Sequence, residues 1–166
     1  WVADQRVDPI ELLAANGVDA FRVRLWVGEK GESKLAYATD VARRAQEAGM
    51  RPYLVLFLTE DWADVNSQPA PTAWADLPLA ERAAAVRQYT RETAQHFIDQ
   101  GIDLDFYEIG NEIDYGICGV FADTPHPRDP TTLRSDTWPD QANLIQAAIE
   151  GVREADAEAR FMLHIA

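Results

Sequence analysis

Four short apolar runs, rich in β-branched and aromatic residues, are spread along the chain. They cover residues 21–27, 52–58, 105–109 and 160–165. Three of them are nearly continuous in apolar character or alternate only weakly between apolar and polar positions. That pattern is typical of strands covered on both faces, as in a parallel sheet. The chain is therefore expected to contribute four buried parallel strands.

Segments with helical periodicity lie before and between these runs. Asp8 and Pro9 are suited to begin the first helix, as N-cap and first helical residue, and Gly17 is suited to end it. The other predicted helices span residues 33–48, 79–100 and 139–155. Strands that alternate with helices indicate βαβ units, so we predict an α/β fold with a parallel sheet and flanking helices.

The connections that leave two of the predicted strands are unusually long. They span residues 59–78 and 111–139, whereas a typical connection from strand to helix has about 2–6 residues. Loops at the carboxyl ends of strands carry the chemistry of α/β proteins. We therefore expect the functional residues in and beside these two loops.

The composition limits the classes of partner. The 166 residues carry a net charge of −13, which argues against nucleic acid and anionic membranes, since both require clustered Lys and Arg. No apolar run is long enough to cross a bilayer. Cys118 is the single cysteine, so it is either a packing residue or a free thiol. No motif for a cofactor or a metal is present, and neutral substrates such as sugars remain open.

The richest candidate for chemistry is Glu112, which follows Gly110 and Asn111 at the end of the third apolar run. A glycosidase acid must protonate a leaving oxygen at a fixed place, and a neighbouring Asn can bind the sugar 2-hydroxyl. The structural alternative is a helix N-cap followed by a solvated glutamate.

Charged and aromatic residues near two other strands are further candidates. Arg22 and Arg24 share one side of the first strand, where Arg24 would favour an ionised carboxylate at Glu112, or where the arginines would form ordinary surface salt bridges. Asp61 and Trp62 follow the second strand and are suited to bind sugar hydroxyls and stack on a sugar ring. Trp62 would otherwise anchor the loop, and the acidic residues there would otherwise bind calcium.

His164, in the last apolar run, either lines the pocket or is a histidine of the core whose hydrogen bonds are satisfied.

The motifs from which a family resemblance is drawn are Phe21–Val27 with its Arg-x-Arg, Ala48-Gly49-Met50, the Trp-Ala-Asp within residues 57–65, Gln68 with Pro71 and Trp74, Tyr89-Thr90, Ile109–Ile113 and Met162–Ala166. In their order and spacing they resemble the arabinogalactan endo-β-1,4-galactanases, glycoside hydrolase family 53, over nearly the whole chain.

The resemblance implies a retaining β-glycosidase on a (β/α)8 TIM barrel. Residues 1–166 would form an internal piece of that one domain, truncated at both ends and holding strands two to five of the eight. Glu112 would be the acid/base, Asn111 would hold the sugar, and Arg24 would support the catalytic carboxylates. The other residues expected to bind substrate are Trp26, Asp61, Trp62 and His164.

The resemblance also implies what lies outside the chain. The nucleophile, a glutamate of the seventh strand, would be absent, so the chain alone is expected to show little or no turnover. Its open sheet edges would favour association. The family acts on plant-type polysaccharide, which favours a carbohydrate substrate and a secreted or periplasmic location.

The sequence departs from the family pattern at several positions. Phe57 and Leu58 replace a His-Tyr pair, Val65 replaces a proline, and Cys118-Gly119 stands near a lost Trp-Pro. These changes remove polar and aromatic groups from the expected pocket. They leave open an alternative function, namely a non-catalytic carbohydrate-binding or degenerate barrel.

Overall fold

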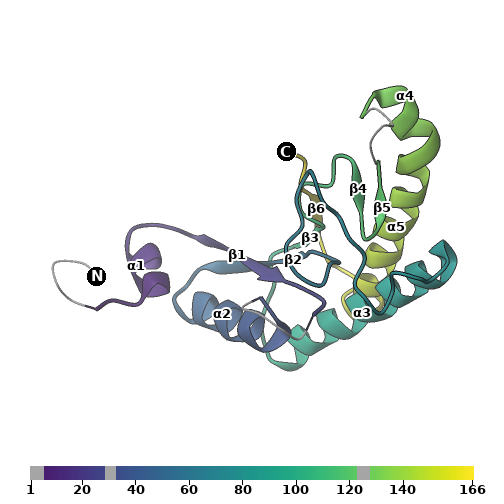
Figure 1. Cartoon of the computed structure of the whole chain (residues 1–166). Helices are drawn as coiled ribbons and strands as arrows, with labels where there is room; N and C mark the ends of the chain where they lie inside the picture. The colour runs from purple at the N-terminus through teal and green to yellow at the C-terminus, as the bar shows by residue number, and fades with distance from the viewer. Residues whose placement is uncertain (1–5, 29–32, 123–127) are drawn as a thin grey trace.

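The computed structural model describes residues 6–28, 33–122 and 128–166. Its centre is a four-stranded parallel sheet (Figure 1). The strands are β1 (Ala20–Leu25), β2 (Arg51–Leu56), β3 (Tyr107–Ile109) and β6 (Phe161–Leu163). They lie side by side in the order β1-β2-β3-β6, which is also their order along the chain. The predicted parallel sheet is confirmed.

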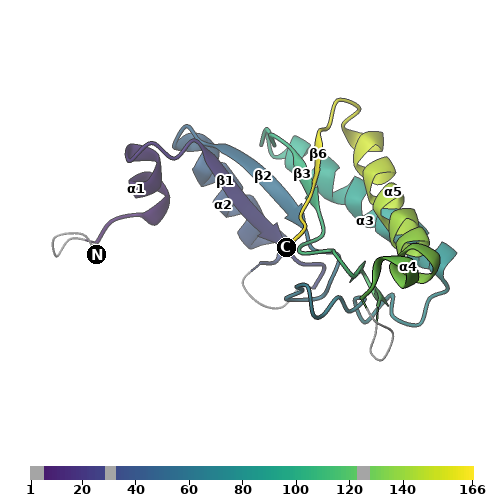
Figure 2. The same ribbon diagram turned by 90° about the horizontal axis from the view of Figure 1, so that it is seen from above.

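Helices connect the strands and line the outer side of the curved sheet (Figure 2). They are α2 (Leu35–Glu47), α3 (Leu79–Asp99) and α5 (Trp138–Ala155), whereas α1 (Pro9–Ala15) precedes β1. As predicted, the Asp8 side chain caps α1 by accepting a hydrogen bond from the Ile10 N–H. The helices α3 and α5 pack against one another at Gly151 of α5, where an added Cβ would lie 2.2 Å from the Arg87 carbonyl oxygen of α3.

Apolar side chains cover both faces of the sheet, which explains the weak alternation in the sequence. On the outer face, residues such as Val23, Leu54 and Ile109 pack in the core with the helices. On the concave face, Val55 and Phe57 form a second cluster. Ala63 belongs to the same cluster, and the partly buried Trp26 and Tyr53 pack against it.

The strands are shorter than the apolar runs, and at the end of β1 the reason is that the backbone bonds to loop residues. The N–H groups of Trp26 and Val27 donate to the carbonyl oxygens of Ser33 and Thr59, so β1 ends at Leu25. At the start of β3, Asp105 lies outside the strand, and its carboxylate binds arginines of the neighbouring β2 and the β6 approach.

The long loop after β3 contains elements that the sequence analysis did not predict. They are the antiparallel pair β4 (Gly116–Ile117) and β5 (Val120–Phe121), the short helix α4 (Pro130–Thr132) and the π-helix η1 (Leu133–Thr137). Together they lead the chain from the end of β3 to α5. Within the residues described, no helix is both long and apolar enough for a membrane span.

Candidate active site

The turn at the end of β3 requires glycine. Gly110 has φ +76°, and a Cβ at this position would lie 2.3 Å from Cγ2 of Ile113. Glu112 also has a positive φ, +51°, which is uncommon for a side chain with a Cβ and is concentrated at functional sites. The backbone therefore leaves the strand in a constrained path that sets the position of Asn111 and Glu112.

The loop after β2 holds Glu112. The half-buried Glu112 side chain accepts a hydrogen bond at Oε2 from the Val65 N–H, with an N–O distance of 3.2 Å. Gln68 reinforces this contact, because its Nε2 donates to the carbonyl oxygens of Asn111 and Glu112 at 2.7 and 3.2 Å. The two long loops thus meet at the predicted catalytic carboxylate.

From the sequence, Arg24 was expected to support the catalytic carboxylates, Glu112 among them. The described residues contain no ion pair between these two side chains. The exposed Arg24 guanidinium instead lies over the Trp62 ring, 5.3 Å from its centroid. Arg24 is two residues further along β1 than Arg22, and at that point it faces the Trp62 ring of the loop after β2.

A partly buried charged cluster is formed around Glu108, and we call it the Glu108 cluster. It consists of Glu108 and Asn111 from β3 and its exit, Arg22 from β1, and His164 beyond β6. Glu108 and Asn111 are 1% and 2% exposed. Sequence reasoning identified Asn111 and His164 but missed Glu108. The available signal was a lone carboxylate within an apolar strand, which is costly to bury without a partner.

Trp62 and Asp61 lie in the loop that follows β2. The Trp62 side chain is 46% exposed, and its Nε1 donates to Oδ2 of Asp64 at 3.0 Å. Its ring centroid is 5.8 Å from that of Phe57. Asp61 is exposed. An exposed indole ring whose position is fixed by a hydrogen bond and a ring contact is suited to stack on a sugar.

Two carboxylates of this loop, Glu60 and Asp64, are engaged by neighbouring groups. Glu60 accepts hydrogen bonds from Thr72, and Asp64 accepts one from the Asn66 N–H, which lowers the pKa of Asp64. Across the described parts of the chain, no three His, Cys, Asp or Glu side chains are grouped as a metal would require.

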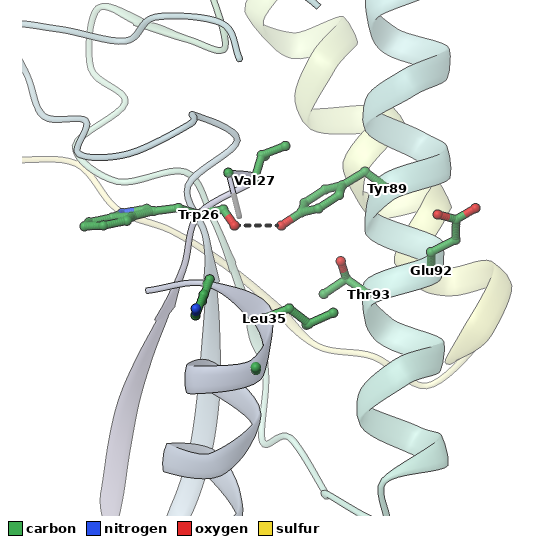
Figure 3. Close-up of a pocket in the computed structure, with 9 residues that line it drawn as sticks. Trp26, Val27, Leu35, Tyr89, Glu92 and Thr93 are labelled. Carbon is green, nitrogen blue, oxygen red and sulfur yellow. Dashed lines mark hydrogen bonds between the residues drawn. The ribbon is translucent and has the colours of Figure 1, made fainter. Parts of the chain in front are cut away.

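Trp26 separates the concave face from a pocket outside it. The pocket has a volume of about 480 Å³ and lies among the end of β1, α2 and α3 (Figure 3). Figure 3 shows the Tyr89 hydroxyl donating to the Trp26 carbonyl oxygen, at 3.4 Å, while the indole ring points the other way. That ring meets Phe57 edge to face at 6.4 Å, and its buried Nε1 has no hydrogen-bond partner among the described residues. Glu112 does not line this pocket.

Comparison with known proteins identifies the family. The model of Glycosyl hydrolase family 53 matches residues 3–166. The chain belongs to this family. The resemblance drawn from the sequence motifs is thereby confirmed.

Individual relatives agree with this assignment. The family 53 chain is 30% identical over 164 residues to the probable arabinogalactan endo-beta-1,4-galactanase A of Aspergillus fumigatus (strain CBS 144.89), covering 96% of the chain and 43% of that protein. It is 35% identical over 129 residues to the arabinogalactan endo-beta-1,4-galactanase A of Emericella nidulans, covering 76% of the chain and 37% of that protein. The chain thus spans less than half the length of these curated relatives.

Solved structures support the fold. A structure from a study of two fungal beta-1,4-galactanases has a TM-score of 0.80 at 31% identity, over 95% of the family 53 chain and 45% of the solved chain. The GH53 catalytic domain of Ignisphaera aggregans also has a TM-score of 0.80, at 26% identity, over 96% and 44%. The four strands and their helices are therefore part of a (β/α)8 barrel, as predicted.

Proposed function

We propose that the complete protein containing this chain is a retaining glycoside hydrolase of the endo-β-1,4-galactanase type, with Glu112 as its acid/base. The observation that carries the proposal is the position of Glu112. Its half-buried carboxyl group lies at the carboxyl end of β3, where the Val65 N–H holds it, within a chain that matches family 53 over residues 3–166. Active sites of (β/α)8 barrels lie at this end of the strands.

The reaction needs two carboxyl groups about 5–5.5 Å apart. Protonated Glu112 would give its proton to the glycosidic oxygen as the bond to the anomeric carbon breaks. A second carboxylate, supplied by a part of the protein outside this chain, would attack the anomeric carbon and form a glycosyl-enzyme intermediate. Ionised Glu112 would then take a proton from water, whose oxygen attacks the anomeric carbon and releases the second carboxylate.

The substrate would be a neutral polysaccharide bound along the concave side of the sheet. The exposed Trp62 ring would stack on a sugar, with Arg24 and Asp61 beside it as hydroxyl partners. We propose that Asn111 and His164 lie against the sugar next to Glu112, and that Trp26 forms part of the floor. The family resemblance implies action outside the cell, on plant-type polysaccharide.

The test is Glu112→Gln in the full-length protein. Turnover of β-1,4-galactan should fall by at least about 100-fold, because positioned general acid catalysis contributes about 10²–10⁴-fold. An aryl galactoside with a good leaving group needs little protonation, so its first step should lose much less. The exposed Glu158, in the turn between α5 and β6, provides a matched control, since Glu158→Gln removes the same charge away from the site.

Each result has a distinct meaning. If Glu112→Gln turned over both substrates at the rates of the unaltered protein, the acid/base role would be refuted. Galactan binding by the unaltered full-length protein with no hydrolysis would instead support the non-catalytic carbohydrate-binding alternative.

A further inference from the structure

The Glu108 cluster contains a carboxylate that the proposed reaction does not use. Glu108 has an exposed side-chain fraction of 2%, so it cannot be a solvated surface charge. Arg22 approaches it with two nitrogens: Nε donates to Oε2 at 3.1 Å and Nη2 donates to Oε1 at 2.5 Å. A two-pronged contact of this kind fixes the plane of the guanidinium group as well as its position.

Because Arg22 is fixed in this way, its hydrogen bond also orients the side-chain amide of Asn111. The same Nη2 atom donates to Oδ1 of Asn111 at 2.8 Å, and Nδ2 of Asn111 donates to the Ala63 carbonyl oxygen at 2.9 Å. A flipped amide would turn its NH₂ group toward the arginine N–H and its oxygen toward a carbonyl oxygen. The Asn111 amide therefore has one orientation that the cluster tolerates.

The cluster also selects a tautomer of His164. Its Nδ1 lies 3.1 Å from Oδ1 of Asn111 and 3.3 Å from Oε1 of Glu108, and both of these atoms are acceptors. Nη2 of Arg22, at 3.3 Å from Nδ1, already donates to those same two oxygens. Nδ1 must therefore carry a proton, which leaves Nε2 as the acceptor of the neutral ring.

Stability alone does not account for this arrangement. A buried ion pair is often no more stabilising than apolar residues of similar volume, because desolvation of both charges opposes their attraction. Here the carboxylate lies four residues before Glu112 on the same strand and exit. Two of the three other members of the cluster, Asn111 and His164, are predicted substrate contacts.

We propose that Glu108 is a positioning residue: acting through Arg22, it fixes the amide of Asn111 and the Nδ1–H tautomer of His164 for the substrate. This inference rests on the proposed function for its effect on turnover, but the geometry it assigns to His164 can be measured without turnover.

The test is Glu108→Gln in the full-length protein. The replacement has nearly the same shape, but an amide presents one acceptor oxygen and one NH₂ group, and Arg22 approaches with two donors. One N–H of Arg22 would therefore face another N–H, and the arginine should rotate away from Asn111. Nitrogen-15 NMR of the imidazole, assigned with His164→Gln, should show the Nδ1–H form losing its dominance. Hydrolysis should lose about 10- to 100-fold in kcat/KM, mostly in kcat, because small misplacements at a reacting centre cost up to about 100-fold.

A second variant and a control separate positioning from folding. Arg22→Lys keeps the positive charge but loses the fork, so it should reproduce both effects, and the double variant should lose no more than either single variant. Asp105→Asn removes a carboxylate paired with Arg51 and Arg160 at the other end of the β3 segment. It should leave both the tautomer and kcat unchanged, even if it lowers stability.

Two outcomes would overturn the inference. One is a folded Glu108→Gln protein with the original His164 tautomer and original kcat. The other is Arg22→Lys with both readouts unchanged, which decides the question even where Glu108→Gln does not fold. If Glu112→Gln retained full activity while Glu108→Gln changed the tautomer, the proposed function would fail and the assigned geometry would stand.

Discussion

Replacing Gly110 with alanine should test whether the backbone at the end of β3 is confined by both its φ angle and its neighbours. At φ +76° an L-residue is disfavoured by about 1–2 kcal/mol. The added Cβ would also lie 2.3 Å from Cγ2 of Ile113 and 2.9 Å from Cδ1 of Ile117. Both isoleucines are buried, 3% and 0% exposed, so neither can move freely, and overpacking costs about 1–3 kcal/mol.

The two effects together predict a loss of about 2–5 kcal/mol in the free energy of unfolding for Gly110→Ala. Gly49 supplies the matched control, since it has φ +83° but nothing within 4 Å of an added Cβ. Gly49→Ala should therefore lose only about 1–2 kcal/mol. The stiffening of the unfolded chain by alanine is common to both variants and cancels in the comparison.

The assay is urea unfolding of the full-length protein, with hydrolysis measured on the folded fraction. Gly110→Ala should also lower turnover, because the strained backbone carries Asn111 and Glu112. Adding Ile113→Ala to Gly110→Ala removes the nearest methyl group, so the double variant should be more stable than the sum of the two single losses predicts. The reasoning is refuted if Gly110→Ala costs no more stability than Gly49→Ala.

One further variant and one labelling reaction test the packing of the chain. Gly151→Ala should destabilise the protein, because the new Cβ would lie 2.2 Å from the Arg87 carbonyl oxygen. This loss is expected although alanine is the better helix former by about 1 kcal/mol. A raised urea midpoint would contradict the close approach of α3 and α5. Burial raises the pKa of the Cys118 thiol to about 12, so at pH 8 the thiol should react with iodoacetamide only after the protein unfolds. Mass spectrometry would measure the labelling, and rapid labelling of the native protein would show that Cys118 is accessible.

The sequence by itself determined the order and type of the main elements. The alternation of apolar runs with amphipathic segments predicted four parallel strands and their helices, and the structure confirms them in that order. Such predictions succeed because strand and helix periodicities are local properties of the chain. The Gly110-Asn111-Glu112 exit was likewise readable, since a glycine turn after an apolar strand in an α/β fold places the next residues at the carboxyl edge.

Only the tertiary structure decided which charged groups meet. Arg22 and Arg24 share one face of β1 and are equivalent in the sequence pattern, yet Arg22 binds Glu108 and Arg24 lies over Trp62. The contact of Val65 with Glu112 was equally hidden, because it joins a loop and a strand exit that are distant in sequence. The periodicity of the sequence predicts on which face of a strand or helix a side chain lies. The curvature of the sheet, the length of each side chain and the path of the long loops decide its partner, and these arise only when the whole chain has packed.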